Sequence, residues 1–219
     1  MSPARTTPPT EGPQLGLRER KKIKTRTAIR DATYALIKEQ GYDATTIEQI
    51  ADRAEVSPST VFRYFPTKED IVVTDEYDPV LLAELAGRPV DEPWVDSLRH
   101  VTRRALRFGL EREPEITRLR ARLMATVPAV RGRMVESMVV TGRQIAEAVS
   151  ARTGLHRDSL EVRVFTMSLV GGLAEITLYW AENDFRDDPA DLVDRALAVL
   201  EHGLAPGKPG GHPPSAMPS

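Results

Sequence analysis

The chain has 219 residues and a mass of 24.3 kDa, with 41% apolar and 28% charged residues, which is typical of a globular protein. Cysteine is absent, and this excludes disulfides, thiolate metal sites and a cysteine nucleophile. Residues 1–16 lack the apolar segment of a secretory signal, and no apolar run approaches the roughly 18 residues that span a bilayer, so we expect a cytoplasmic protein.

Charge is distributed unevenly, although the formal net charge is only -2. Residues 17–68 contain 11 Lys and Arg against 7 Asp and Glu, whereas residues 69–219 contain 18 against 24. The cations of the first segment cluster between positions 18 and 30. A basic start before an acidic remainder indicates a polyanionic partner at one end of the protein, with a merely solvated helix face as the alternative.

Hydrophobic periodicity predicts an all-α protein. Residues 1–16 and 205–219 are rich in Pro and Gly without periodicity, and we expect a disordered arm and tail there. Between these ends strand-like alternation is missing. Gly41 ends the first predicted helix, and Thr46 and Ser57 cap the next two. The predicted helices span residues 18–40, 47–55, 58–65, 68–77, 79–86, 94–112, 114–126, 128–152, 158–183 and 189–203.

Two short helices joined by "AEVS" at residues 54–57 predict a helix-turn-helix. Val56 is the apolar residue that fixes the two helices at an angle. On the second helix, Val61, Phe62 and Phe65 are expected to face inward. The opposite face is short, polar and rich in donors, which suits the major groove of DNA. It comprises Ser57, Ser59, Thr60, Arg63 and Tyr64.

The run "TRTAIRDATYALIKEQGYDATTIEQIADRAEVSPSTVFRYFPTKEDIV", residues 25–72, resembles the N-terminal domain of tetracycline-repressor-like (TetR family) transcriptional regulators. The matching features are "GYDATTIEQIA", "AEVSPSTVFRYF" and the following "KED". The resemblance implies a DNA-binding domain at residues 17–67 and a helical ligand-binding and dimerisation domain at residues 68–204. It also implies a homodimer on a palindromic operator, because two domains related by a two-fold axis read two half-sites.

The resemblance also implies roles for single residues. Thr46 would contact a phosphate, and Lys68 would bind a second phosphate beside the start of its helix. The polar set from Ser57 to Tyr64 would enter the groove. Basic residues at the start of the first helix would reach the DNA backbone or minor groove. These are Lys21, Lys22, Lys24 and Arg26.

Beyond residue 70 the resemblance is weaker, but the family plan implies a ligand pocket among the middle helices. For each candidate lining residue the alternative is an ordinary place in the hydrophobic core. The candidates are Trp94, Leu98, Val101, Phe108, Leu119, Leu123, Met124, Val127, Met134, Met138, Ile145 and Phe165. The run "RLRARL" adds Arg120, and arginine binds phosphate or carboxylate groups in a bidentate manner. The stretch "ITRLRARLMATVPAVRGRMVE" resembles actinobacterial regulators of the acyl-CoA-sensing type, which implies a small apolar or acyl-CoA-like effector.

The last two predicted helices are apolar beyond the need of a surface helix. We therefore expect them to pair with their copies in a four-helix dimer interface, with intramolecular core as the alternative. The candidate interface residues are Leu169, Gly172, Leu173, Ile176, Trp180, Val193, Leu197 and Leu200.

Three functional hypotheses follow from these patterns. The first is a ligand-responsive regulator, most simply a repressor, and the second is a constitutive DNA-binding protein without a small-molecule ligand. The third, an enzyme, is disfavoured because the four His residues are scattered and no nucleophile–base or metal-ligand spacing is found. No cofactor, metal site or membrane partner is predicted.

Overall fold

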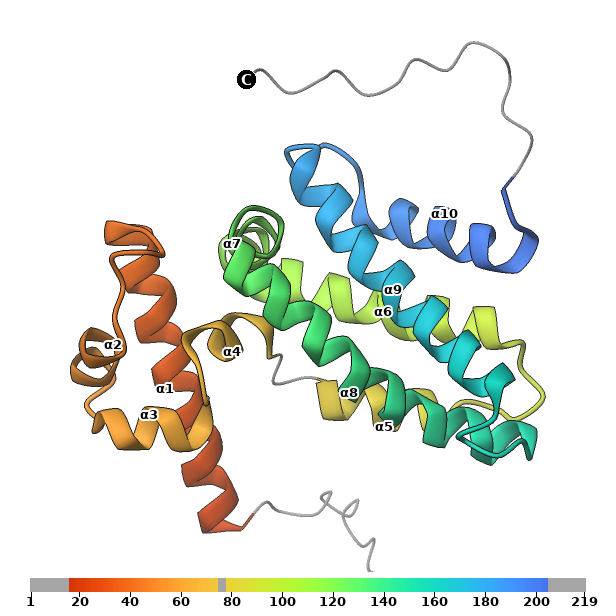
Figure 1. Ribbon diagram of the computed structural model, residues 1–219, viewed down its shortest axis with the longest axis horizontal. Helices are drawn as coiled ribbons and strands as arrows, with labels where there is room; N and C mark the ends of the chain where they lie inside the picture. Colours follow the sequence, from red (N-terminus) through yellow and green to blue (C-terminus); the bar gives the residue numbers. More distant parts are fainter. Residues whose placement is uncertain (1–15, 75–77, 205–219) are drawn as a thin grey trace, which may run out of the picture. The chain divides into compact units, whose positions relative to one another are not determined.

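The computed structural model describes residues 16–74 and 78–204, and the chain divides into two compact units between Ile71 and Val72. Within the described residues all regular structure is helical, as predicted (Figure 1). The predicted disordered ends, apart from Gly16, lie outside the described residues. The helices are α1 (Leu17–Gln40), α2 (Ile47–Arg53), α3 (Pro58–Tyr64), α4 (Lys68–Val73), α5 (Asp78–Ala86), α6 (Trp94–Arg112), α7 (Pro114–Thr126), α8 (Pro128–Thr153), α9 (Leu160–Glu182) and α10 (Pro189–His202).

The first unit packs α2 and α3 against α1 around a small apolar core. The core side chains come from these three helices, from the residue after α3 and from α4, and they are Ile29, Leu36, Ile50, Ala51, Val61, Phe65 and Ile71. Gly41 ends α1 with a φ of 86° and a ψ of 166°. Such a backbone is open to glycine but strained for other residues, so Gly41 fixes where the chain leaves α1.

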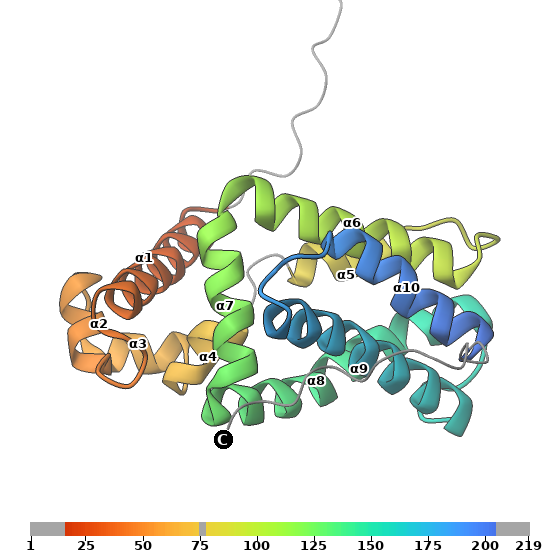
Figure 2. The ribbon, with the colours of Figure 1, turned by 90° about the horizontal axis from the view of Figure 1, so that it is seen from above.

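The second unit is built around α9, which packs against α7, α8 and α10 (Figures 1 and 2). Val162, Leu169 and Trp180 from α9 join Val193 and Leu197 from α10 in its core. Among the described residues α9 is also long and apolar enough to cross a membrane, by length and composition alone. Packing against three neighbouring helices buries 39% of that apolar stretch and accounts for part of its composition, because a helix that is apolar on several sides suits a core.

Proline and polar caps set several helix boundaries. Pro114, Pro128 and Pro189 begin α7, α8 and α10, where the missing N–H would have no intrahelical partner. The Asp188 carboxylate caps α10 by accepting a hydrogen bond from the backbone N of Ala190 at 2.8 Å. These helices therefore begin at the residues the sequence indicated.

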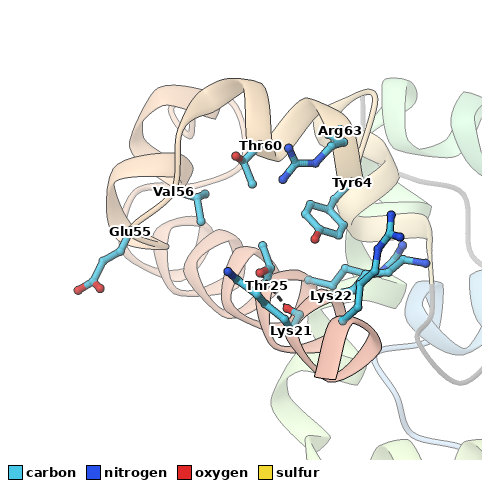
Figure 3. A pocket seen from close by; sticks show the side chains of 10 residues that line it. Lys21, Lys22, Thr25, Glu55, Val56, Thr60, Arg63 and Tyr64 are labelled. Atoms are coloured by element: carbon cyan, nitrogen blue, oxygen red, sulfur yellow. Dashed lines mark hydrogen bonds between the residues drawn. The ribbon is translucent and has the colours of Figure 1, made fainter. Parts of the chain in front are cut away.

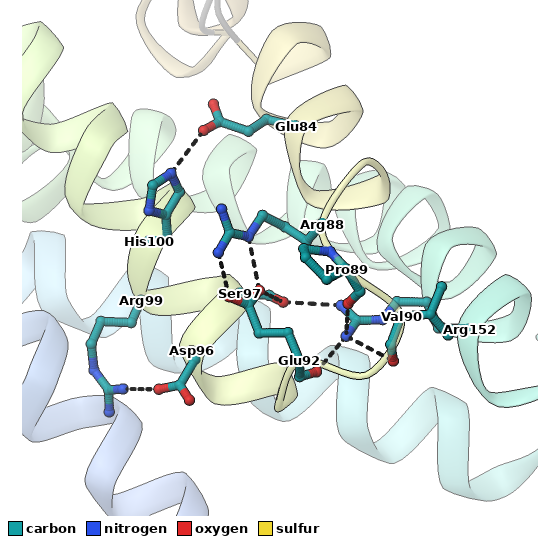
Figure 4. Close-up of polar contacts among 10 residues, drawn as sticks. All are labelled: Glu84, Arg88, Pro89, Val90, Glu92, Asp96, Ser97, Arg99, His100 and Arg152. Atoms are coloured by element: carbon teal, nitrogen blue, oxygen red, sulfur yellow. Dashed lines mark hydrogen bonds and ion pairs between the residues drawn. The ribbon is translucent and has the colours of Figure 1, made fainter.

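Arg152, near the end of α8, fastens the loop that joins α5 to α6 (Figure 4). Its guanidinium donates to the carbonyl oxygens of Pro89 at 2.9 Å and Glu92 at 2.5 Å, and to Ser97 Oγ at 3.0 Å. It also lies 4.2 Å from the ring centre of Trp94. Hydrogen bonds from Arg88 and Ser97 lower the pKa of the Glu92 carboxyl to about 2, so it stays ionised above that pH.

Candidate nucleic-acid interface

Side-chain caps and one left-handed residue fix the geometry of the helix-turn-helix. Thr46 Oγ1 accepts from the backbone N of Gln49 at 3.3 Å, and Gln49 Oε1 accepts from the backbone N of Thr46 at 2.9 Å. This capping box starts α2. In the turn Glu55 has a φ of 55°, and the backbone N of Val56 donates to Ala51 O at 3.0 Å. The positive φ at Glu55 reverses the chain, and Val56 packs onto the core as predicted.

The start of α3 carries three linked hydroxyl groups. Ser57 caps the helix, because its Oγ accepts from the backbone N of Thr60 at 3.2 Å. The same oxygen lies 2.9 Å from Ser59 Oγ and 2.9 Å from Thr60 Oγ1. Pro58 occupies the first helical position. The cap therefore orders a cluster of short polar side chains at the solvent-facing start of the helix.

The faces of α3 differ from the prediction most clearly at Phe62, while Thr60 and Tyr64 are half-buried and Tyr64 packs on the core. Val61 and Phe65 are 0% and 1% exposed, so both face the core as expected. Phe62 is 49% exposed, and the expectation that it holds the unit together is wrong. Ser59 and Arg63 are exposed, as predicted for a surface that meets DNA.

A basic groove lies between the first turns of α1 and the outer side of α3, and we call it the α1–α3 groove (Figure 3). It has a volume of about 930 Å³. Figure 3 shows Lys21 and Thr25 of α1 facing Thr60 and Tyr64 of α3 across it, while the Glu55 carboxylate points away. The lining residues are Arg18, Lys21, Lys22, Thr25, Arg26, Glu55, Val56, Thr60, Arg63 and Tyr64.

The groove concentrates positive charge on one concave surface, with five basic side chains and one acidic side chain in its lining. Arg26 and Arg63 also contact aromatic rings, with their guanidinium carbons 4.7 Å from the centre of the Phe65 ring and 5.3 Å from that of Tyr64. These contacts orient two long side chains towards the groove. A concave basic surface beside a helix of donors can accept a phosphate backbone while that helix meets base edges.

Sequence reasoning overlooked Arg18 and Thr25 as groove residues. A signal for them was present, because positions 18, 21, 22 and 25 have the spacing i, i+3, i+4 and i+7 of one helix face. Lys24 is exposed on α1 and lies outside the lining. Thr46 is exposed, and its hydroxyl serves as the α2 cap.

Lys68 begins α4, as expected, and its side chain is bonded within the protein. Its ammonium group donates to the carbonyl oxygens of Tyr42 and Thr45, each at 2.9 Å, and lies 4.0 Å from the centre of the Tyr42 ring. Two of its three donors are thus used within the protein. Lys68 therefore fastens the α1–α2 connection to the start of α4, and its phosphate contact stays a prediction.

The predicted ligand-binding residues are distributed over several parts of the second unit. Trp94 and Phe165 meet edge-on with ring centres 5.9 Å apart, and Phe108 lies 4.7 Å from the Arg112 guanidinium carbon. Arg120 Nε donates to Val72 O at 3.0 Å, so this arginine contacts the end of α4. The remaining candidate lining residues are all buried or half-buried. They are Leu98, Val101, Leu119, Leu123, Met124, Val127, Met134, Met138 and Ile145.

Most of the predicted dimer residues lie in the core of their own unit. Five of them are buried, with Leu173 half-buried against them: Leu169, Ile176, Trp180, Val193 and Leu197. Gly172 and Leu200 instead line a surface groove of about 330 Å³, which we call the α9–α10 groove. Its other lining residues are Glu175, Ile176, Tyr179, Leu192, Arg195, Ala196 and Val199. Apolar periodicity had mostly selected the inward sides of α9 and α10, and pairing of these helices with a second copy stays a prediction.

Comparison with known proteins agrees with this geometry. Residues 29–73 match the family model described as bacterial regulatory proteins, tetR family, and residues 92–205 match the model described as MftR C-terminal domain. The transcriptional regulator TcmR of Streptomyces glaucescens is 35% identical over 164 residues, which are 70% of each chain. The repressor KstR of Mycobacterium tuberculosis is 43% identical over 49 residues, or 22% of each chain.

Solved structures extend the similarity to the whole fold. FadR of Thermus thermophilus, a TetR family repressor in complex with lauroyl-CoA, has a TM-score of 0.52 and 27% identity, covering 86% of this chain and 100% of that one. FadR of Bacillus subtilis, in complex with stearoyl-CoA, shares the fold at a TM-score of 0.55 and 18% identity, with 84% and 100% covered. The members of this family are transcriptional regulators rather than enzymes. We conclude from the helix-turn-helix, the helical second unit and these matches that the chain belongs to the tetR family of bacterial transcriptional regulators.

Proposed function

We propose that this regulator is a cytoplasmic repressor that binds a palindromic operator as a homodimer and is released by a small apolar or acyl-CoA-like effector. The observation that carries the DNA-binding part is the α1–α3 groove beside the exposed side of α3. The four other basic residues of the groove contact phosphates in this proposal, and Arg63 reaches a base edge. These four are Arg18, Lys21, Lys22 and Arg26. An arginine on the outer side of a helix can bind guanine in a bidentate manner, which gives specificity, whereas phosphate contacts give register.

The α9–α10 groove is the proposed dimer surface. Tyr179, Val199 and Leu200 are large exposed residues beside it, at 39%, 45% and 43% exposure. Two antiparallel helices that expose apolar side chains on one face can pair with their symmetry copies as a four-helix arrangement. A dimer also suits the first unit, because a single small helix-turn-helix makes too few contacts for a selective site.

The effector class rests on similarity and on the composition of the second unit. The FadR protein solved with lauroyl-CoA is 27% identical to this chain over most of its length. Met124, Met134 and Met138 lie among the buried and half-buried side chains of α7 and α8, and flexible thioethers adapt to apolar ligands. An acyl chain would displace or rearrange such side chains, and that rearrangement would favour one protein conformation over another.

Arg120 connects α7 to the end of α4, and this connection could transmit the response to the DNA-binding unit. It donates to the carbonyl oxygens of Val72 at 3.0 Å and Val73 at 3.4 Å, at the end of α4, while Lys68 is bonded at the start of the same helix. A shift of α7 caused by effector would therefore pull on α4, which continues from the DNA-binding unit. In this account Arg120 is a positioning residue and not an effector ligand.

Fluorescence anisotropy on a labelled duplex tests the proposal. The duplex is selected from a random-sequence library with the full-length protein, and lauroyl-CoA is then titrated against the complex, with coenzyme A as the control. We expect tight binding to the selected duplex and release by lauroyl-CoA alone. Failure to select any duplex contradicts DNA recognition. Selective binding that no acyl-CoA chain length changes instead favours the constitutive alternative.

In the same assay, Arg120→Ala should keep its affinity for the duplex but require more lauroyl-CoA for release. The reason is that the substitution removes the connection between α7 and the end of α4 without touching the DNA-facing residues. An unchanged effector response in a folded Arg120→Ala protein contradicts this role of the arginine.

A further inference from the structure

Phe62 is the large apolar side chain on the outer part of α3 that the DNA contacts proposed above do not use. It is 49% exposed, whereas the other phenylalanine of the helix-turn-helix, Phe65, is 1% exposed. Its neighbours along the helix, Ser59 and Arg63, are also exposed. Phe62 therefore adds a substantial apolar surface to a part of the molecule that is otherwise polar and cationic.

Helix geometry places Phe62 on a particular flank of α3. Successive residues of an α-helix are rotated by about 100°. Phe62 therefore lies about 60° from Ser59 and about 100° from Arg63, but about 160° from both Thr60 and Tyr64. Thr60 and Tyr64 line the α1–α3 groove. The outer side of α3 thus has a flank facing the basic groove, a central ridge at Ser59 and Arg63, and an apolar flank at Phe62.

A helix in the major groove brings both of its outer flanks near base edges. The apolar group that base pairs present there is the C5-methyl group of thymine, and a phenyl ring without a hydroxyl has no hydrogen bond to offer in its place. We propose that Phe62 recognises a thymine methyl group in each half-site of the operator, so that this residue determines sequence preference. The inference depends on the proposed DNA-binding function and names a contact within it.

Deoxyuridine substitution measures this contact, because deoxyuridine differs from thymidine only by the missing methyl group. Each symmetric pair of thymines in the selected duplex is replaced in turn, and affinity is measured for the wild-type protein, for Phe62→Ala and for Val140→Ala. Val140 is an exposed apolar residue of α8, at 58% exposure, and serves as the matched control. Circular dichroism melting of each variant establishes that it is folded.

The expected result has a defined size. Burying one methyl group contributes about 0.8 kcal/mol, which corresponds to about a fourfold change in affinity per half-site and about fifteenfold for the symmetric pair. Wild type and Val140→Ala should lose this factor at one pair of thymines. Phe62→Ala should bind the unmodified duplex more weakly and lose nothing further when that pair is replaced.

Other outcomes overturn the inference. If no thymine pair is sensitive to its methyl group in the wild type, or the selected duplex lacks thymine in its half-sites, Phe62 does not read a methyl group. The same conclusion follows if Phe62→Ala and wild type respond equally at every position, or if Phe62→Ala alters only the oligomeric state. These results leave selective DNA binding intact, whereas failure to obtain a selected duplex contradicts the proposed function itself.

Discussion

The charge of the α1–α3 groove predicts how steeply DNA binding depends on salt, and one substitution tests it. Four groove cations other than Arg63 are available for phosphates in each chain: Arg18, Lys21, Lys22 and Arg26. In a dimer they would release counterions at about eight phosphates. The logarithm of the association constant should then fall with the logarithm of salt concentration at a slope of about -7. Lys21→Gln removes one contact per chain and should make the slope less steep by about 1.8.

Lys38→Gln is the matched control for this measurement. Lys38 is an exposed lysine in the last turn of the same helix, so the substitution removes the same charge at the far end of α1. Fluorescence anisotropy between 50 and 200 mM salt gives the slope for each protein, and Lys38→Gln should keep the wild-type value. Equal slopes for wild type and Lys21→Gln, or equal reductions in both variants, would refute a localised phosphate site in the groove.

Four further predictions concern single residues. Arg63→Ala should reduce discrimination between the selected duplex and random DNA by about 1–3 kcal/mol per half-site, and equal losses on both DNAs would reduce Arg63 to a phosphate contact. Ser57→Ala should lower the free energy of unfolding by about 1 kcal/mol through loss of the α3 cap, as denaturant titration would show, and an unchanged midpoint would contradict the capping role. The pKa of Glu92 is about 2, below its ordinary value of 4.5, so its ionised form stabilises the fold above about pH 4.5 and this contribution is lost as the pH falls towards 2. Glu92→Gln should therefore melt at a lower temperature than wild type at pH 7 and approach it at pH 2, and a constant difference would contradict the ion pair. Leu200→Glu places a charge in the α9–α10 groove and should yield monomers in light scattering, and a stable dimer would exclude this surface.

Local sequence chemistry predicted where many helices begin in both units, and it predicted the turn of the helix-turn-helix. Thr46, Ser57 and Asp188 satisfy the first free N–H groups of their helices, a requirement that depends on only three or four neighbouring residues. Pro114 and Pro128 mark helix starts for a similarly local reason. Such signals can be recognised in the sequence because the interacting atoms are close along the chain.

Assignments that depend on distant neighbours were less successful. Phe62 is adjacent to Val61 and was assigned to the same inward side, but the core is filled by Val61 and Phe65 and leaves Phe62 in solvent. Leu169 and Val193 were assigned to a dimer interface, and the chain buries both within its own core. Apolar periodicity shows that a helix face is buried but does not show whether the partner is the same chain or a second copy.

Charged residues illustrate the same limit. The composition of α1 correctly indicated a basic surface, because Lys21 and Lys22 lie together on the groove. Lys68 and Arg120, however, donate to backbone carbonyl oxygens that only the folded chain brings near them. A sequence shows that a cation is present, whereas its partner depends on tertiary packing.

Hydrogen–deuterium exchange, measured by mass spectrometry with and without the selected duplex, tests the DNA-binding surface most directly. If the groove and the outer side of α3 bind the duplex, exchange should slow in peptides that cover residues 17–26 and 57–64. Exchange in the same experiment should remain unchanged along α6, which forms part of the second unit. A duplex that binds tightly while both of these segments exchange at their original rates would contradict the proposed interface.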